Sequence, residues 1–403
     1  MALCLGRFLS PASAADDFAS NALLHDGLPP GAHILKIGDP APEFSLLGID
    51  GKTYTLADFK DAPLLMVAFL SNHCPVSHAI EPRLLPYVAE MRKKGLAVVA
   101  INPNAPEALR VEELGYSKYN DGYEEMKLYA RDRGFKFPYL YDGDTQVTAM
   151  AYGCLATPEV FIFDRARRLR YKGRFDNSRL PDPASVTRRD APDAIAALLA
   201  GRPVDVPVTL ALGCSTKWKL KATDVAESEE RWDREPVRVD PIDDAGVAAL
   251  ARNDSKRLRV INVWATWCVP CVEEFPGLVS LARRFSTRPF DLITISLDDP
   301  KEKAAVKRFL EKHHAAVPEP AMPAVTAQGR RTDSYYYTGT DTDGFGRALD
   351  PHWQGALPCT LVIAPGGQVL YRHSGALDLT AFRGFLVDTL GLYYDQARIH
   401  AVR

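Results

Sequence analysis

The apolar positions of this chain follow the same order twice. A continuous apolar run over 64–70 predicts a buried strand, and helical spacing after it predicts a helix whose apolar face is formed by Ile80, Leu84, Val88 and Met91. A second apolar run over 260–264 leads into a helix of the same kind, with Val272, Phe275, Val279 and Ala282 on its apolar face. We interpret the two segments as copies of one unit.

Downstream features repeat as well. Each copy continues with a second strand ("LAVVAIN" and "FDLITISL"), then a helical stretch (122–133 and 301–314), then a proline followed by two strands. Each copy closes with a helix, over 191–200 and 379–390. The first copy also begins with a hairpin, whose turn is Asp50-Gly51. This alternation predicts the α/β class, with two domains that each have a central mixed β-sheet flanked by helices.

Composition divides the chain further. We expect an N-terminal tail over 1–33, with a remnant export signal as the alternative, a first domain over 34–224 and a second over 237–403. The intervening segment, 225–236, is charged and poor in aliphatic residues, which indicates a linker. Residues 318–355, rich in Pro, Gly, Thr and Asp, are predicted to form an irregular insertion in the second copy.

The overall charge excludes some classes of partner. Lys and Arg nearly balance Asp and Glu, with a formal net charge of −2 across 403 residues, so nothing favours binding to nucleic acid. No stretch approaches the roughly 20 apolar residues of a membrane helix. We therefore expect neither a nucleic-acid partner nor a transmembrane segment.

The seven cysteines indicate chemistry rather than cross-linking, because their number is odd and they are spread over a long chain. Cys268 and Cys271 form a Cys-x-x-Cys motif where a predicted strand gives way to a helix. Backbone N–H groups at a helix start lower the pKa of a thiol, and a second thiol one turn later can release a bound partner. Zinc binding would need further ligands, and His313-His314 more simply lie on a solvated helix face. We expect no metal and no organic cofactor.

The corresponding position in the first copy is Cys74, but Ser77 replaces the second thiol. A disulfide at Cys74 must then be closed by Cys154, by Cys214, by a small thiol or by another protein. Cys154 is our first candidate because it lies four residues before Pro158. It could equally be a packed residue, and for Cys214 we favour the packed-residue interpretation. A protonated His73 or His78 would stabilise the Cys74 thiolate; alternatively, His73 only caps the strand end.

The residues "NVWATWCVPC" and "GALPCTLVIAPGG" resemble the TlpA/ResA-like branch of the thioredoxin superfamily, over roughly 237–395. The resemblance implies a thioredoxin-like domain in which Trp267 precedes the active cysteine and Pro358 is a cis-proline whose loop faces the dithiol. Asn262 departs from the family, since thioredoxins keep a buried acid there, which leaves the proton acceptor unassigned. Cys359 is also unexpected; it is either a packed residue or an accessory thiol.

The first copy, through "GDPAPEFSL", "SNHCPVS", "TPEVFIFD" and "GCSTKW", resembles the peroxiredoxin-like redoxins of the AhpC/TSA group over roughly 34–220. The chain therefore resembles two thioredoxin-like domains in tandem, with Thr157-Pro158 in the place of the second cis-proline loop. Peroxiredoxins carry Thr or Ser three residues before the active cysteine and Pro seven before it. Ser71 fits this pattern and Val67 does not.

These features predict a thiol-disulfide oxidoreductase that uses Cys268 and Cys271, with a second, single-cysteine site at Cys74 and a relay between them. Its partners would be protein or small-molecule thiols and disulfides, with an external electron donor or acceptor. One alternative is a peroxidase centred on Cys74, with peroxide as substrate. Another is a non-catalytic redox sensor or partner-binding module. The resemblance implies the bacterial periplasm or cell envelope, with the cytoplasm as the alternative.

Overall fold

The computed structural model describes residues 28–391, so most of the predicted N-terminal tail lies outside the described residues. Contacts within the chain separate two compact units. Among the described residues, the first unit contains 28–108 and 119–222, and the second contains 109–118 and 223–391. The segment 109–118, which the sequence assigned to the first domain, therefore groups with the second unit. There Arg284 donates a hydrogen bond to the carbonyl of Ser117 at 2.7 Å.

The first unit is built on a mixed sheet with the strand order β2-β1-β5-β4-β3-β7-β8. Its central strand β3 pairs in parallel with β4 and antiparallel with β7. The predicted hairpin is present as β1 and β2. The strands are β1 (Ser45–Gly48), β2 (Thr53–Thr55), β3 (Leu64–Phe69), β4 (Leu96–Asn102), β5 (Tyr139–Tyr141), β7 (Glu159–Phe163) and β8 (Leu169–Gly173).

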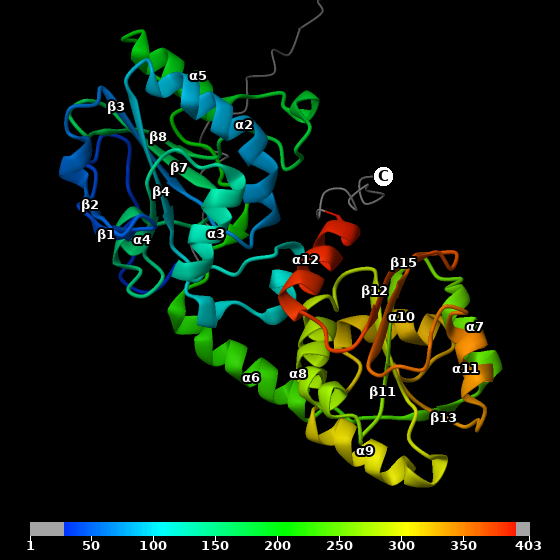
Figure 1. Ribbon diagram of the computed structural model, residues 1–403. Coiled ribbons are helices and arrows are strands. Elements are labelled where there is room, and N and C mark those ends of the chain that lie inside the picture. Colours follow the sequence, from blue (N-terminus) through cyan, green and yellow to red (C-terminus); the bar gives the residue numbers. More distant parts are fainter. Residues whose placement is uncertain (1–27, 392–403) are drawn as a thin grey trace, which may run out of the picture. The chain divides into compact units, whose positions relative to one another are not determined.

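Helices cover both faces of this sheet (Figure 1). Successive residues of β3 point to opposite faces, so Met66 packs with the residues of α2, α3 and α5, whereas Val67 packs with those of α4. The helices are α2 (Pro75–Arg92), α3 (Tyr123–Arg133), α4 (Val147–Tyr152) and α5 (Asp190–Leu199). Two short strands, β6 (Ala156–Thr157) and β9 (Cys214–Ser215), form a two-stranded sheet that is separate from the main sheet.

The second unit has a six-stranded mixed sheet in the order β10-β13-β12-β11-β14-β15. As in the first unit, the central strand β11 pairs in parallel with the next strand, β12, and antiparallel with a later one, β14. The strands are β10 (Asp240–Ile242), β11 (Leu258–Trp264), β12 (Phe290–Ser296), β13 (Ser334–Tyr337), β14 (Cys359–Ile363) and β15 (Val369–Ser374).

One face of this sheet packs against α8, α9 and α12, and the other against α7 and α11. Their bounds are α7 (Asp244–Arg252), α8 (Val269–Arg284), α9 (Lys303–Lys312), α11 (Thr342–Leu349) and α12 (Leu379–Leu390). The sequence prediction of an α/β fold with two helix-flanked mixed sheets is confirmed.

Two segments are more regular than predicted. The expected linker over 225–236 is mostly helical, since α6 covers Ala222–Asp233. The expected irregular insertion over 318–355 contains α10 (Met322–Ala327), α11 and β13, and β13 pairs in parallel with β10 and β12. That prediction was wrong because Tyr335 and Tyr337 are buried by the sheet rather than exposed on a loop.

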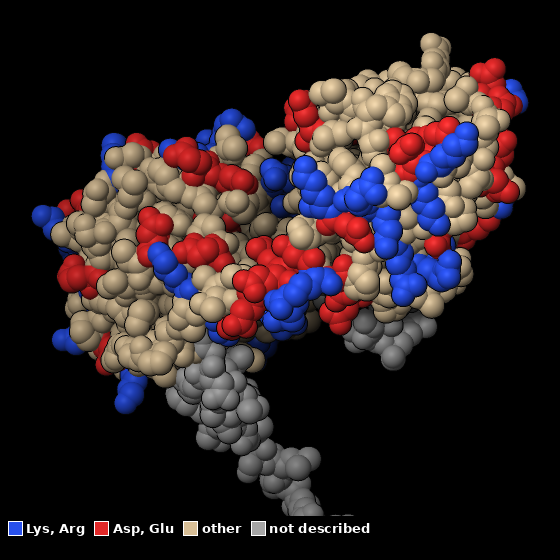
Figure 2. All heavy atoms as spheres, turned by 90° about the horizontal axis from the view of Figure 1, so that it is seen from below, with Lys and Arg blue, Asp and Glu red and all other residues tan. Residues whose placement is uncertain are grey.

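The surface agrees with the charge balance. On the face shown in Figure 2, acidic and basic side chains are interspersed with uncharged ones. Between residues 28 and 391, none of the helices has the length and apolar character needed to cross a membrane.

Candidate functional site

Cys268 occupies the N-cap of α8, and a disulfide joins it to Cys271 in the first turn of that helix. Pro270 lies in the first turn, where its missing N–H removes no helical hydrogen bond. The neighbours Trp267 and Val269 are 67% and 66% exposed, whereas the two cysteines are buried. The disulfide therefore lies just beneath an exposed apolar rim.

The predicted cis-proline loop is present in this unit. The Leu357-Pro358 peptide bond is cis, and Leu357 packs against the apolar cluster that contains both cysteines. The strand that follows, β14, pairs with the end of β11 through Cys359 and Val263. Strand pairing thus brings the proline loop to the edge where α8 begins.

A buried carboxyl lies one turn after Cys271. Glu274 accepts a hydrogen bond from Asn262 Nδ2 at 3.0 Å and another from the backbone N–H of Leu377 at 2.9 Å. Asn262 Nδ2 also contacts Thr360 Oγ1 at 3.0 Å. Burial raises the pKa of Glu274, although both hydrogen bonds oppose the shift. A buried acid is thus present on the helix and bonded to Asn262, and the sequence analysis did not identify it.

Cys359 lies on the opposite face of the sheet from the disulfide. It belongs to the apolar cluster with Leu361 and Ile363, whereas Val362 packs with Cys268 and Cys271. Burial raises the pKa of the Cys359 thiol to about 11. This position favours the packed-residue interpretation over an accessory thiol.

In the first unit, Cys74 is the N-cap of α2, followed by Pro75. Its thiol is fully buried and donates a hydrogen bond to the carbonyl of Thr157 at 3.0 Å. The Thr157-Pro158 peptide bond is cis. Ser71 Oγ lies 2.8 Å from Thr157 Oγ1, so the loop is held at two points beside Cys74.

The residue before the cysteine forms a buried charged pair. His73 Nδ1 lies 2.6 Å from Asp121 Oδ2, and both side chains are buried. Burial lowers the pKa of His73, but the charge and the hydrogen bond of Asp121 outweigh it, and the net pKa is raised. His73 therefore does more than cap the strand end. Its Nε2 atom is buried and has no hydrogen-bond partner among residues 28–391.

Asp121 was missed by the sequence analysis. Its carboxylate also accepts hydrogen bonds from Asn104 Nδ2 and from the backbone N–H of Asn72, both at 2.7 Å. Burial raises the pKa of Asp121, but the charge of His73 and the hydrogen bonds lower it by more, so the net shift is downward. The "NDG" sequence before α3 indicates only a helix start, so no local signal identified this residue.

The pKa of Cys74 is lowered to about 6. Burial raises it, but a hydrogen bond from the Cys214 thiol and the charge of His73 lower it by more. Backbone N–H groups of Ser77 and Cys214 add to the effect. This lowered pKa favours the reactive thiolate that the sequence analysis expects at Cys74, and Ser77 contributes to it through its backbone N–H.

His78 does not supply the positive charge that we considered. Burial lowers its pKa to about 3, and its Nε2 atom lies 2.7 Å from the carbonyl of Asn72. The neutral ring packs on Tyr129, with the centroids 5.5 Å apart. Of the two histidines considered, His73 is therefore the one whose charge lowers the pKa of Cys74.

The structure separates the two candidate resolving cysteines. Cys214 is half-buried, and its thiol and backbone N–H contribute to lowering the pKa of Cys74. Cys154 is fully buried in the apolar cluster on the α4 side of the sheet, where its sulfur lies 3.4 Å from Thr216 Oγ1. Burial raises the pKa of Cys154 well above that of a free thiol.

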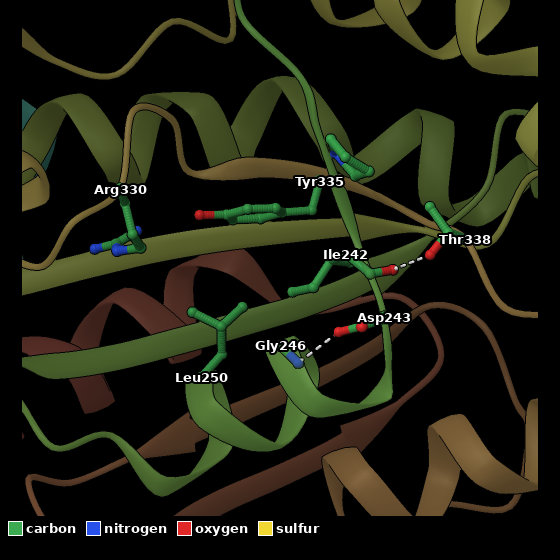
Figure 3. Close-up of a pocket in the computed structure, with 8 residues that line it drawn as sticks. Ile242, Asp243, Gly246, Leu250, Arg330, Tyr335 and Thr338 are labelled. Atoms are coloured by element: carbon green, nitrogen blue, oxygen red, sulfur yellow. Dashed lines mark hydrogen bonds between the residues drawn. The ribbon is translucent and has the colours of Figure 1, made fainter.

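The grooves of the second unit are not centred on its cysteines. The one shown in Figure 3 has a volume of about 400 Å³ and is lined mainly from β10, α7 and β13. Its polar groups serve the fold: Asp243 accepts the N–H of Gly246, and Thr338 donates to the carbonyl of Ile242. Across 28–391, no cluster of His, Cys, Asp and Glu is suited to hold a metal ion.

Comparisons with known proteins place these features in context. The thiol-disulfide oxidoreductase ResA of Oceanobacillus iheyensis is 26% identical over 129 residues, which cover 32% of this chain and 55% of that protein. A thiol:disulfide interchange protein DsbE homologue of Paracoccus denitrificans is 29% identical, over 30% of this chain and 52% of that protein. The chain thus spans about half the length of the curated relatives it matches.

Among solved structures, a hypothetical protein from Sinorhizobium meliloti is 37% identical, with a TM-score of 0.42. That match covers 47% of this chain and 97% of the other. The model of the AhpC/TSA family matches two regions, 37–172 and 244–372, one around each helix-capping cysteine. Because these regions together make up more than half of the sequence, the chain belongs to the AhpC/TSA family.

Proposed function

We propose that the protein is a thiol-disulfide oxidoreductase whose second unit exchanges a dithiol for a disulfide through Cys268 and Cys271. The observation that carries the proposal is the pair itself, at the N-terminus of α8 and beneath the exposed Trp267. When a partner thiolate attacks Cys268, the helix N-terminus stabilises the thiolate that departs. The names of the ResA and DsbE relatives support this reaction class.

Glu274 is the proton acceptor in this proposal. A carboxyl whose pKa is raised by burial can take a proton from Cys271 at neutral pH and return it later. Asn262 and Leu377 hold the carboxyl in place through one hydrogen bond each.

The proposal includes a tandem arrangement. Cys74 is the redox centre of the first unit, and the Cys268-Cys271 pair reduces it after oxidation. The lowered pKa of Cys74 supports a redox role, since the thiolate is the reactive form. The substrates are thiols and disulfides of proteins or small molecules, an external donor or acceptor completes the cycle, and the expected location is the bacterial cell envelope.

A peroxidase centred on Cys74 is the second candidate. It is favoured by the Ser71 and Thr157 hydroxyls next to an activated thiol, since such groups can hydrogen-bond a peroxide. Val67, which is buried in β3, departs from the peroxiredoxin pattern, because peroxiredoxins carry proline at that position.

The relay predicts a trapped intermediate. With Cys271→Ser, a mixed disulfide between Cys268 and a cysteine of the first unit should accumulate, because no second thiol can release it. Non-reducing electrophoresis and peptide mapping would detect it. The Cys268→Ser/Cys271→Ser variant is the control and should form none. Absence of any such species in Cys271→Ser would contradict the relay.

Glu274→Gln should slow disulfide exchange by about 100-fold or more, because the amide cannot accept the Cys271 proton. Stopped-flow reduction of a disulfide peptide between pH 5 and 9 would measure the rate. Glu273→Gln, at the adjacent exposed position, is the matched control and should behave as wild type. Equal rates for both variants would show that Glu274 is not the acceptor.

The ionisation of Cys74 can be followed as thiolate absorbance at 240 nm, by subtracting the titration of Cys74→Ser from that of the wild type. We expect a midpoint near pH 6. Asp121→Asn removes the carboxylate that keeps His73 charged, so the thiolate loses a positive neighbour. The midpoint should then rise toward about 8.5, the value of a free cysteine. Asp144→Asn, at an exposed position, should leave it unchanged.

The peroxidase candidate predicts rapid formation of a sulfenic acid at Cys74 when hydrogen peroxide is added. A dimedone adduct on Cys74, measured by mass spectrometry, would report it. Peroxide consumption should be lost in Cys74→Ser and retained in Cys359→Ala. Consumption by Cys74→Ser at the wild-type rate would exclude this candidate.

A further inference from the structure

We propose that Cys214 closes a disulfide with Cys74 and is the sulfur through which a partner dithiol reduces that disulfide. The inference rests on the proposed redox role of Cys74 and identifies the residue that completes the first site. Cys214 would close a disulfide with the helix-capping cysteine, as Cys271 does in the second unit. In addition, Cys214 would be the sulfur that the partner thiolate attacks.

The backbone places the two sulfurs together. Cys214 in β9 is paired directly with Thr157 in β6, and the carbonyl of Thr157 accepts the hydrogen bond of the Cys74 thiol. Residues directly opposite in an antiparallel pair have Cα atoms only about 4.5–5.5 Å apart. Cys214 also contributes to lowering the pKa of Cys74, through its thiol and its backbone N–H.

Gly213 makes this approach possible. A Cβ atom at that position would lie 2.0 Å from the carbonyl oxygen of Thr157 and 2.8 Å from the nitrogen of Pro158. Neither is the movable end of a side chain, so any other residue would push β9 away from the cis-proline loop. The glycine therefore holds Cys214 against the loop that contacts Cys74.

Access differs between the two sulfurs. Cys74 is 0% exposed, and its neighbours His73 and Ser77 are buried as well. Cys214 is only half-buried, so part of this residue is in contact with solvent. In a Cys74-Cys214 disulfide, a protein thiol can approach Cys214 without opening the core around α2.

The exchange balances with a partner dithiol as reductant. A partner thiolate attacks Cys214, a partner-Cys214 disulfide forms, the Cys74-Cys214 bond breaks and Cys74 leaves as a thiolate. The second thiolate of the partner then attacks the partner sulfur that is bonded to Cys214. The partner disulfide forms, and Cys214 is released and takes up a proton. The partner loses two electrons, and the Cys74-Cys214 pair gains them. Cys74 is the better leaving group because the charge of His73 and the backbone N–H of Ser77 stabilise its thiolate, and both remain when Cys214 is in a disulfide.

Cys154 offers the opposite arrangement. It packs with Val67 and Phe69 on the face of the sheet away from α2, and its sulfur contacts Thr216 and the carbonyl of Ala156. To reach Cys74 it would have to leave the apolar layer. It is therefore the matched control for Cys214 within the same unit.

The test uses the full chain with Cys268→Ser and Cys271→Ser, so that only the first unit can form an internal disulfide. The protein is oxidised with glutathione disulfide, free thiols are blocked, and linked peptides are mapped by mass spectrometry. We expect a Cys74-Cys214 peptide in this background and in Cys154→Ala, and its loss in Cys214→Ala. Circular dichroism and thermal melting would confirm that Cys214→Ala and the milder Cys214→Ser are folded.

A second measurement tests the direction of attack. The oxidised protein is treated briefly with reduced glutathione and quenched in acid, and the adduct should be on Cys214. An adduct on Cys74, or a Cys74-Cys154 peptide in place of Cys74-Cys214, would overturn the inference. Disulfide-peptide reduction by the wild-type Cys268-Cys271 pair is measured in parallel. Loss of that activity beside an intact Cys74-Cys214 disulfide counts against the proposed function, whereas normal activity without the disulfide counts against this inference.

Discussion

The antiparallel pairing of two strands organises each candidate site. In both units, the strand that ends just before a helix-capping cysteine pairs with the strand that follows a cis-proline: β3 with β7, and β11 with β14. The pairing brings the proline loop to the N-terminus of the helix. In the first unit the result is direct, because the carbonyl before the proline contacts the cysteine sulfur. The first N–H groups of the helix, which have no partner within the helix, can then stabilise the thiolate of a cysteine whose position the sheet has fixed.

Burial shifts the pKa of the three acidic groups of these sites in the same direction, and charged neighbours and hydrogen bonds decide the sign of the net shift. Removal from water raises the pKa of Cys74, Asp121 and Glu274 alike. Cys74 and Asp121 each have a charged neighbour in His73 and several donors, so their anions are stabilised overall. Glu274 has two hydrogen-bond donors, which do not offset its burial, so the net shift of its pKa is upward. In similarly buried surroundings, the pKa of the thiol in one unit is therefore lowered, whereas that of the carboxyl in the other is raised, as suits the proton acceptor that we propose.

The two units differ in where the second sulfur comes from. In the second unit, Cys271 lies one helical turn after Cys268 and needs no other element to reach it. In the first, Ser77 occupies that turn, and the nearby sulfur is delivered by β9 through its pairing with the proline loop. A local partner is thereby replaced by one from a distant segment. The replacement requires a glycine before Cys214, since only a residue without Cβ allows the two backbones to approach.

The sequence by itself determined the elements whose causes are local. Apolar periodicity predicted β3 with α2 and β11 with α8, the Asp50-Gly51 turn predicted the first hairpin, and helix-start cysteines predicted reactive thiols. These features depend on residues within about one turn or one strand of each other, so spacing is enough to recognise them.

Only the tertiary structure decided the partners of those thiols. Asp121, Glu274 and Cys214 meet their partners through sheet register and helix packing, and nothing in their own flanking residues marks them. The same limit explains the segment 318–355, whose polar composition predicted a loop although β13 is stabilised by the strands beside it. His73 and His78 show it most directly: they lie five residues apart, yet Asp121 raises the pKa of His73, whereas burial and the charge of Arg133 lower the pKa of His78.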